Sequence, residues 1–142
     1  MIRYLLDTNT ISELARKRPD ANVQTWFVRQ KTKQLYLSSF TVAEIEMGIA
    51  QHPDASKAER LRNWLEGSIL PNFSQRILGF DLAAARVYGR WAGLARKTGR
   101  SLPVVDSQIA AIAFVHGLVV VTRNTEDFKH VPVTVVNPWI LE

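Results

Sequence analysis

Short apolar runs alternate with helical segments along this chain, and that alternation limits the possible folds more than any other feature. Five runs are expected to be strands because they are short and rich in apolar residues: 2–6, 35–39, 76–80, 118–122 and 133–137. The run LVVVT at 118–122 shows no polar alternation, as expected of a strand that is covered on both faces. Strands separated by helices predict a parallel or mostly parallel sheet with helices on both faces, an α/β/α sandwich.

The helical segments are predicted from apolar residues that recur three and four positions apart. They are expected at 10–17, 21–31, 41–50, from 55 to Pro71, from Asp81 to Lys97 and from Asp106 to Gly117. Two of them carry long apolar stripes that we expect to be buried: Leu61, Trp64, Leu65 and Ile69 in one, and Ala84, Val87, Tyr88, Trp91, Leu94 and Ala95 in the other.

Length and composition predict a single domain over residues 1–142. A chain of 142 residues with 46% hydrophobic side chains can bury one core, and no stretch of it has the composition of a linker. The absence of cysteine excludes disulfides, Cys-ligated zinc, iron–sulfur clusters and a thiol nucleophile. No apolar run has the length of a secretion signal or a membrane span, so we expect a cytoplasmic protein with no membrane partner.

The charge balance favours a polyanionic partner such as nucleic acid. The chain has 18 Lys and Arg against 13 Asp and Glu, a formal net charge of +5. Each basic residue also has a plain explanation as part of a solvated helix face. The candidates for phosphate contact are Arg16, Lys17, Arg18, Arg86, Arg90, Arg96, Lys97 and Arg100.

Four carboxylates follow the predicted strands, at the positions where open α/β sheets bind ligands. Asp7 follows the first strand, Glu44 falls in the first turn of the helix after the second strand, Asp106 opens a helix, and Asp127 follows LVVVT. Together they would form a hard-oxygen pocket for Mg²⁺ or Mn²⁺, ions that take few carboxylates directly and keep several waters.

Each of the four also has a structural explanation. Asp7 and Asp106 are placed to cap the helices that follow them. The run from Thr41 to Glu44 matches a capping box, in which the glutamate reaches back to a backbone N–H. Asp127 fits a turn. The catalytic interpretation therefore depends on all four meeting at one edge of the sheet.

Other chemistries find little support in the sequence. The three histidines, His52, His116 and His130, show neither HExxH spacing nor a nucleophile-elbow serine nearby. The segment GLARKTGRS at 93–101 lacks the lysine and the preceding strand of a phosphate loop, so it reads as a helix and its terminal turn. The run from Asp7 to Thr10 is similar to the DxDxT start of haloacid-dehalogenase phosphotransferases, but Asn9 stands where the second aspartate is needed.

Four segments in order resemble the PIN-domain ribonucleases, especially the VapC toxins of bacterial toxin–antitoxin pairs. They are LLDTNTISEL at 5–14, SSFTVAEIEMGI at 38–49, LPVVDSQIAAIA at 102–113 and LVVVTRNTEDF at 118–128. The resemblance covers essentially the whole chain. It implies a PIN-like fold and a Mg²⁺- or Mn²⁺-dependent endoribonuclease whose acidic positions match Asp7, Glu44, Asp106 and an acidic residue of the last segment.

The resemblance also suggests a role for each site residue. Asp7 and Asp106 are expected to ligate the metal directly, Glu44 to act through a water, and Asp127 to support a second ion. Many relatives have an aspartate where this chain has Asn124, a neutral oxygen ligand at most, so Asp127 is our candidate for the fourth carboxylate. Thr122 would add a hydroxyl, and Asn9 would orient Asp7 or form an Asx-turn.

Partners are implied by the same resemblance. VapC-like proteins are typically homodimers inhibited by a cognate VapB-like antitoxin, and their substrate is RNA. Large apolar side chains such as Trp26, Phe27, Val28, Trp64 and Trp139 are compatible with an interface, although each also suits a core. The alternative from another class is a PIN-like module that binds RNA or protein without cleaving it.

Overall fold

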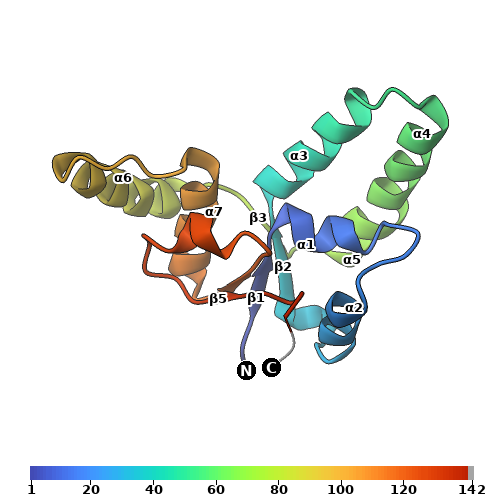
Figure 1. The fold of residues 1–142 in the computed structure, drawn as a ribbon, viewed down its shortest axis with the longest axis horizontal. Coiled ribbons are helices and arrows are strands. Elements are labelled where there is room, and N and C mark those ends of the chain that lie inside the picture. The colour runs from blue at the N-terminus through green and yellow to red at the C-terminus, as the bar shows by residue number, and fades with distance from the viewer. Residues whose placement is uncertain (141–142) are drawn as a thin grey trace.

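All five predicted strands are present in the computed structural model, which describes residues 1–140, and they form one sheet (Figure 1). The strand order is β3-β2-β1-β4-β5, and every neighbouring pair is parallel. The expected parallel sheet is confirmed, with strands shorter than predicted. Their bounds are β1 Tyr4–Leu6, β2 Leu35–Ser38, β3 Ile77–Leu78, β4 Val119–Val121 and β5 Val135–Val136.

Helices cover both faces of the sheet, as the α/β/α prediction requires. Figure 1 shows α6 and α7 on one side of the strands and α1 to α5 on the other. Their bounds are α1 Thr8–Glu13, α2 Ala21–Val28, α3 Ser39–Ala50, α4 Ala55–Trp64, α5 Leu70–Asn72, α6 Leu82–Lys97 and α7 Val104–His116, with short 3-10 turns η1 Thr32–Gln34 and η3 Thr125–Phe128. No helix among residues 1–140 is long and apolar enough to cross a membrane.

Two apolar cores lie on opposite faces of the sheet because successive strand side chains point to opposite sides. Leu5 and Val120 pack in the core under α6 and α7. Leu6 and Val121, one residue further on in the same two strands, pack in the core on the side of α1 to α4. Both central strands are therefore buried on both faces, which explains the unbroken apolar run from Leu118 to Val121.

Several helix boundaries differ from the prediction. The first helix spans Thr8–Glu13 rather than 10–17, and the second ends at Val28 rather than 31. The helix expected from 55 to Pro71 is interrupted by a π-helical turn, η2 Leu65–Ile69, before the short α5. An extra residue in that turn shifts the apolar stripe, so Leu65 and Ile69 are buried while Leu61 and Trp64 are half-buried.

One predicted core residue is on the surface. Leu94 of α6 is 64% exposed, whereas Ala84 and Val87 of the same expected stripe are buried. The buried residues lie in the first half of the helix, and no residue of its last turns is buried. Apolar periodicity therefore predicted the helix correctly, but fewer of its residues are buried than the periodicity indicated.

Candidate functional site

The carboxyl ends of the parallel strands lead to three of the four predicted acidic residues at one edge of the sheet. β1 leads into Asp7, β2 leads into α3, and β4 leads into Thr122 and η3. In Figure 1 the start of α3 and the end of β1 lie at the same edge of the sheet. The site is therefore built from connections that are distant in sequence but adjacent in the sheet.

Asp7 is buried at the centre of this edge and is held from several directions. Its Oδ1 accepts a hydrogen bond of 2.9 Å from the Thr8 backbone N–H and so caps α1, as the structural explanation of this residue predicted. Its Oδ2 accepts a 2.8 Å bond from the Thr122 hydroxyl and a 3.4 Å bond from the Asn9 amide. Burial raises the pKa of Asp7, against these hydrogen bonds.

Thr122 is the hub of a small polar network behind Asp7. Its hydroxyl, which donates to Asp7, accepts from the Asn9 side-chain amide at 3.1 Å and from the Asn124 backbone N–H at 3.0 Å. The Asn9 carbonyl oxygen in turn accepts from the Arg123 backbone N–H at 3.3 Å. Asn9 therefore ties the start of α1 to the loop after β4. Asn124 contributes its backbone to this network, while its side chain is exposed.

Glu44 lies further along α3 than predicted. The helix begins at Ser39 with Ser38 as its N-cap, and the Ser38 hydroxyl accepts from the Thr41 N–H at 3.3 Å. Glu44 is thus the sixth helical residue and not in the first turn, and the expected capping box between Thr41 and Glu44 is wrong. Partial burial and the charge of Asp7 raise the pKa of Glu44, while the nearby Thr8 hydroxyl opposes that rise. Glu44 is therefore close enough to Asp7 for their charges to interact.

Asp106 and Asp127 complete the cluster. α7 begins at Val104 after Pro103, so Asp106 is its third residue and does not cap the helix. Burial, the charges of Asp7 and Asp127, a hydrogen bond with the Asp127 carboxyl and the charge of Glu44 raise the pKa of Asp106 to about 6. Asp127 lies in η3, where its carboxyl is exposed. The charges of the other three predicted carboxylates therefore all act on Asp106.

Two threonines of this site were missed from the sequence as functional candidates. The Thr8 hydroxyl donates to Thr41 Oγ1 at 3.0 Å and joins the start of α1 to the first turn of α3. Thr8 also reaches Glu44. The only sequence signal was the position of Thr8 beside Asp7, because the fold alone brings it to Thr41.

The donor set fits a hard divalent cation. Every charged side chain of the cluster is a carboxylate. Burial first, and repulsion between the carboxylates second, raise the pKa values of Asp7, Glu44 and Asp106, a cost that a bound cation would relieve. Within residues 1–140, no three His, Cys, Asp or Glu side chains are close enough to hold a metal ion by themselves. Mg²⁺ takes one or two carboxylates directly and keeps several waters, so it does not require three protein ligands.

The eight predicted basic residues are all exposed, on both sides of the sheet. Arg16, Lys17 and Arg18 follow α1, and Arg16 forms an ion pair of 3.3 Å with Glu13. The others lie on or just after α6, where an Arg100 nitrogen lies 3.0 Å from His130 Nδ1. Two groups of basic residues, one after α1 and one on and just after α6, therefore lie on either side of the acidic site. We call them the cationic arms.

The fold and site define an open α/β domain with a carboxylate cluster at the carboxyl ends of parallel strands. Comparison with known proteins identifies the family within this class of domains. A family model described as PIN domain matches residues 4–133, so the chain belongs to the PIN-domain family.

Relatives from several bacteria cover nearly the whole chain. It is 41% identical to VapC ribonuclease Y4jK of Sinorhizobium fredii, over 95% of this chain and 96% of that protein. It is 42% identical to toxin FitB of Neisseria gonorrhoeae, over 95% and 97%. The crystal structure of FitAcB from Neisseria gonorrhoeae superposes with a TM-score of 0.90 at 42% identity, covering 99% of this chain and all of that one. The resemblance to VapC-type proteins is confirmed.

Proposed function

We propose that this protein is a VapC-like toxin, a metal-dependent endoribonuclease that cleaves RNA phosphodiester bonds and is inhibited by a cognate VapB-like antitoxin. The observation that carries the proposal is the meeting of Asp7, Glu44, Asp106 and Asp127 at one edge of the sheet. Similarity to a protein named a VapC ribonuclease and to one named a toxin supports the same activity.

Asp7 and Asp106 are the proposed direct ligands of Mg²⁺, with Mn²⁺ able to substitute. A divalent ion bound there supplies Lewis-acid polarisation of the scissile phosphate and a water of lowered pKa. Asp7 suits the role because Thr122, Asn9 and the Thr8 N–H fix both of its oxygens. Glu44 is exposed and lies within the electrostatic reach of Asp7, so it is placed to orient the attacking water. Asp127 supports a second ion.

Partner assignments follow from similarity and charge. The structure of FitAcB supports an antitoxin partner for this chain, and the net charge of +5 supports an RNA substrate. We further propose a homodimer that acts in the cytoplasm. The cationic arms can hold RNA phosphates while the carboxylates hold the cation.

The test is cleavage of mixed cellular RNA by the purified protein in Mg²⁺ or Mn²⁺, compared with EDTA and with Asp7→Asn. Glu44→Gln is the second active-site variant, and Glu46→Gln is its matched control, the same change two residues further on in α3. We expect discrete cuts that disappear in EDTA and in both site variants but persist in Glu46→Gln. Absence of cleavage by the wild type, or equal cleavage by Asp7→Asn, would instead favour a non-catalytic module.

A further inference from the structure

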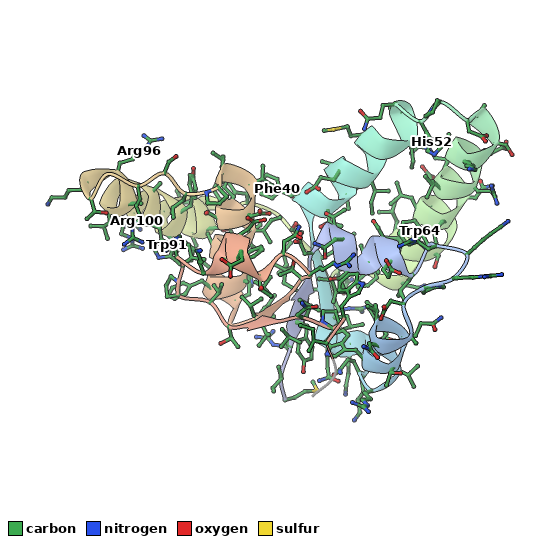
Figure 2. All side chains as sticks on the ribbon, viewed as in Figure 1. Phe40, His52, Trp64, Trp91, Arg96 and Arg100 are labelled. Atoms are coloured by element: carbon green, nitrogen blue, oxygen red, sulfur yellow. The ribbon has the colours of Figure 1, made fainter. Side chains whose placement is uncertain are left out.

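A separate pocket of about 650 Å³ lies at the far ends of α1 and α3 from the carboxylates. Residues that follow α1, His52 in the turn after α3, and one face of α4 line this open pocket. Figure 2 shows two of its residues, His52 beyond α3 and Trp64 at the end of α4. The side chains with a charge or an aromatic ring that line it are Arg16, Lys17, His52, Lys57, Arg60 and Trp64.

The charged side chains that line the pocket are all basic. Four of its residues are Lys or Arg, and among the residues that the structure describes no Asp or Glu lines it. Of the neighbouring carboxylates, Glu46 and Glu66 both pair with Arg62, which does not line the pocket, and Asp54 accepts the N–H groups of Ser56 and Lys57 as the cap of α4. Glu59 is exposed on α4 next to Arg60 but does not line the pocket. Of the four cations, Arg16 has a carboxylate partner, Glu13. The pocket is therefore suited to an anion.

Trp64 gives the pocket a fixed aromatic wall. It is half-buried and immediately precedes the π-helical turn, whose residues Leu65 and Ile69 are 1% and 4% exposed in the core below. Those two buried anchors hold the backbone at Trp64. A half-buried indole in the wall of a basic pocket is the kind of side chain on which nucleic-acid bases stack.

We propose that this pocket binds an unpaired nucleotide of the RNA substrate, with its base stacked on Trp64 and the adjoining phosphates on Lys57 and Arg60. The inference rests on the proposed function and extends it to a second substrate contact. Cations that track a backbone beside an aromatic platform are the usual combination in single-strand binding. An acidic segment of a protein partner is the competing occupant, but it would leave the stacking surface unexplained.

The arrangement of α1 and α3 connects the pocket to the carboxylates. Both helices begin at the carboxylate site and run away from it, and they are joined at that end by the Thr8–Thr41 hydrogen bond. α1 has six residues, about 9 Å at 1.5 Å per residue, so the pocket is only a few nucleotides from Asp7. A strand held there would lie along α1 and bring a phosphate to the carboxylates, which repel phosphate unless a cation is bound.

The first experiment measures binding without cleavage. A fluorescein-labelled single-stranded RNA of about 12 nucleotides is titrated by anisotropy with protein that carries Asp7→Asn, in EDTA, and a gel confirms that the RNA stays intact. Added to that background, Lys57→Gln with Arg60→Gln is compared with Lys31→Gln with Lys33→Gln. The second pair removes the same two charges at η1, before β2 and thus at the opposite edge of the sheet. All four side chains are exposed, and thermal melting checks that each variant is folded.

We expect the pocket pair to weaken RNA binding about ten-fold at low salt and to reduce the slope of log affinity against log salt by roughly 1.4, at about 0.7 per lost phosphate contact. The η1 pair should change both values much less. Equal weakening by the two pairs would overturn the proposal, because only the net charge would then matter. So would weaker binding of the cognate antitoxin by the pocket pair with RNA binding unchanged.

The second experiment tests stacking through tryptophan fluorescence. RNA should quench the emission, and Trp64→Phe should remove most of that quenching while keeping affinity within a few-fold, since phenylalanine still stacks. Trp91→Phe is the control, because Trp91 is also half-buried but lies on α6 (Figure 2). Unchanged quenching in Trp64→Phe would overturn the proposal. Neither experiment requires cleavage, so a failure of the nuclease proposal would be seen separately in the cleavage assay.

Discussion

Thr122 controls the position of Asp7 through one hydroxyl group. Replacing it by valine keeps the shape but removes the 2.8 Å hydrogen bond to Asp7 and the acceptor for the Asn9 amide and the Asn124 N–H. We expect Mn²⁺ to bind roughly ten-fold more weakly to Thr122→Val, the usual cost of losing a group that orients a metal ligand. Calorimetric titration with Mn²⁺ measures this.

Thr122→Ser is the matched control, because it keeps the hydroxyl and loses only a methyl group. Its stability should fall by about 1 kcal/mol from the lost apolar contact, with Mn²⁺ affinity close to that of the wild type. Equal Mn²⁺ affinities for the valine and serine variants would show that the hydroxyl does not position Asp7.

The raised pKa of Asp106 should make the stability of the metal-free protein depend on pH. Its pKa is about 6 in the folded state against 3.8 ordinarily, so between these values the folded protein keeps a proton that the unfolded chain has released. Stability therefore falls as the pH rises from about 4 to about 6, and the penalty is fully present above that window. Because Asp106 is only half-buried, solvent screening limits the penalty to about 1 kcal/mol.

Asp106→Asn should remove this penalty. In EDTA at pH 7.5 we expect the variant to melt about 3 °C above the wild type, with little difference between them at pH 4. Glu59→Gln, a change on the exposed surface of α4, is the control and should leave the pH profile unaltered. A variant that is less stable than the wild type at pH 7.5 would contradict the repulsion among the four carboxylates.

The sequence predicted that the four carboxylates would come together, but it did not predict all of their local surroundings. Asp7 was expected both at a strand end and as a cap, and it occupies both positions. Glu44 and Asp106 were placed too close to their helix starts, because α3 and α7 begin two residues earlier than the polar signals suggested. Thr41 in particular resembles an N-cap in sequence, yet Ser38 caps the helix at the end of β2. Capping patterns are local, whereas the choice among competing caps depends on where the strand ends.

At the scale of elements, the glycine that ends α7 determines how the chain turns from this helix into β4. Gly117 adopts a left-handed conformation with φ of 66°, and the Leu118 N–H then bonds to the Ala113 carbonyl at 2.8 Å, closing the helix before β4. A Cβ at this position would meet nothing within 4 Å, so Gly117→Ala costs backbone strain alone. We expect a loss of about 1 kcal/mol in urea unfolding.

Gly93→Ala is the matched control within the neighbouring helix. Gly93 lies in α6 with ordinary helical backbone, and an added Cβ there also meets nothing within 4 Å. The same substitution should therefore stabilise the protein by up to about 1 kcal/mol, through helix propensity. The two variants should shift the urea midpoint in opposite directions, and a shared direction would show that the glycine conformations do not determine the effect.

Helices and strands were predictable from sequence where apolar residues recurred regularly and the whole element had the same degree of burial. β1 and β4 were found because both are buried on both faces, which leaves an apolar run that no helix pattern imitates. The π-helical turn at Leu65–Ile69 was not predicted, because one inserted residue changes the period and the Gly67–Ser68 pair inside it does not by itself identify a π-helix. That turn bears on the proposed RNA contact because it directly follows Trp64, which lines the pocket.

At the scale of the whole molecule, exposed apolar side chains on α6 and α7 support the proposed homodimer. The Trp91 and Phe114 rings pack edge to face at 5.4 Å, and Leu94, three residues beyond Trp91, lies on the same side of α6. Leu94 and Phe114 are 64% and 49% exposed. An apolar group of this kind costs free energy in water and is typical of a surface that a partner covers.

Light scattering at micromolar concentration should therefore give twice the chain mass of 16.1 kDa. Leu94→Lys should yield a protein of single-chain mass with unchanged secondary structure, because a lysine ammonium at the centre of an apolar contact must be desolvated without a partner. Val28→Lys is the control: Val28 is 85% exposed on α2, on the other face of the sheet, and that variant should remain a dimer. A dimer that survives Leu94→Lys would place the interface elsewhere, and a monomeric wild type would refute the dimer.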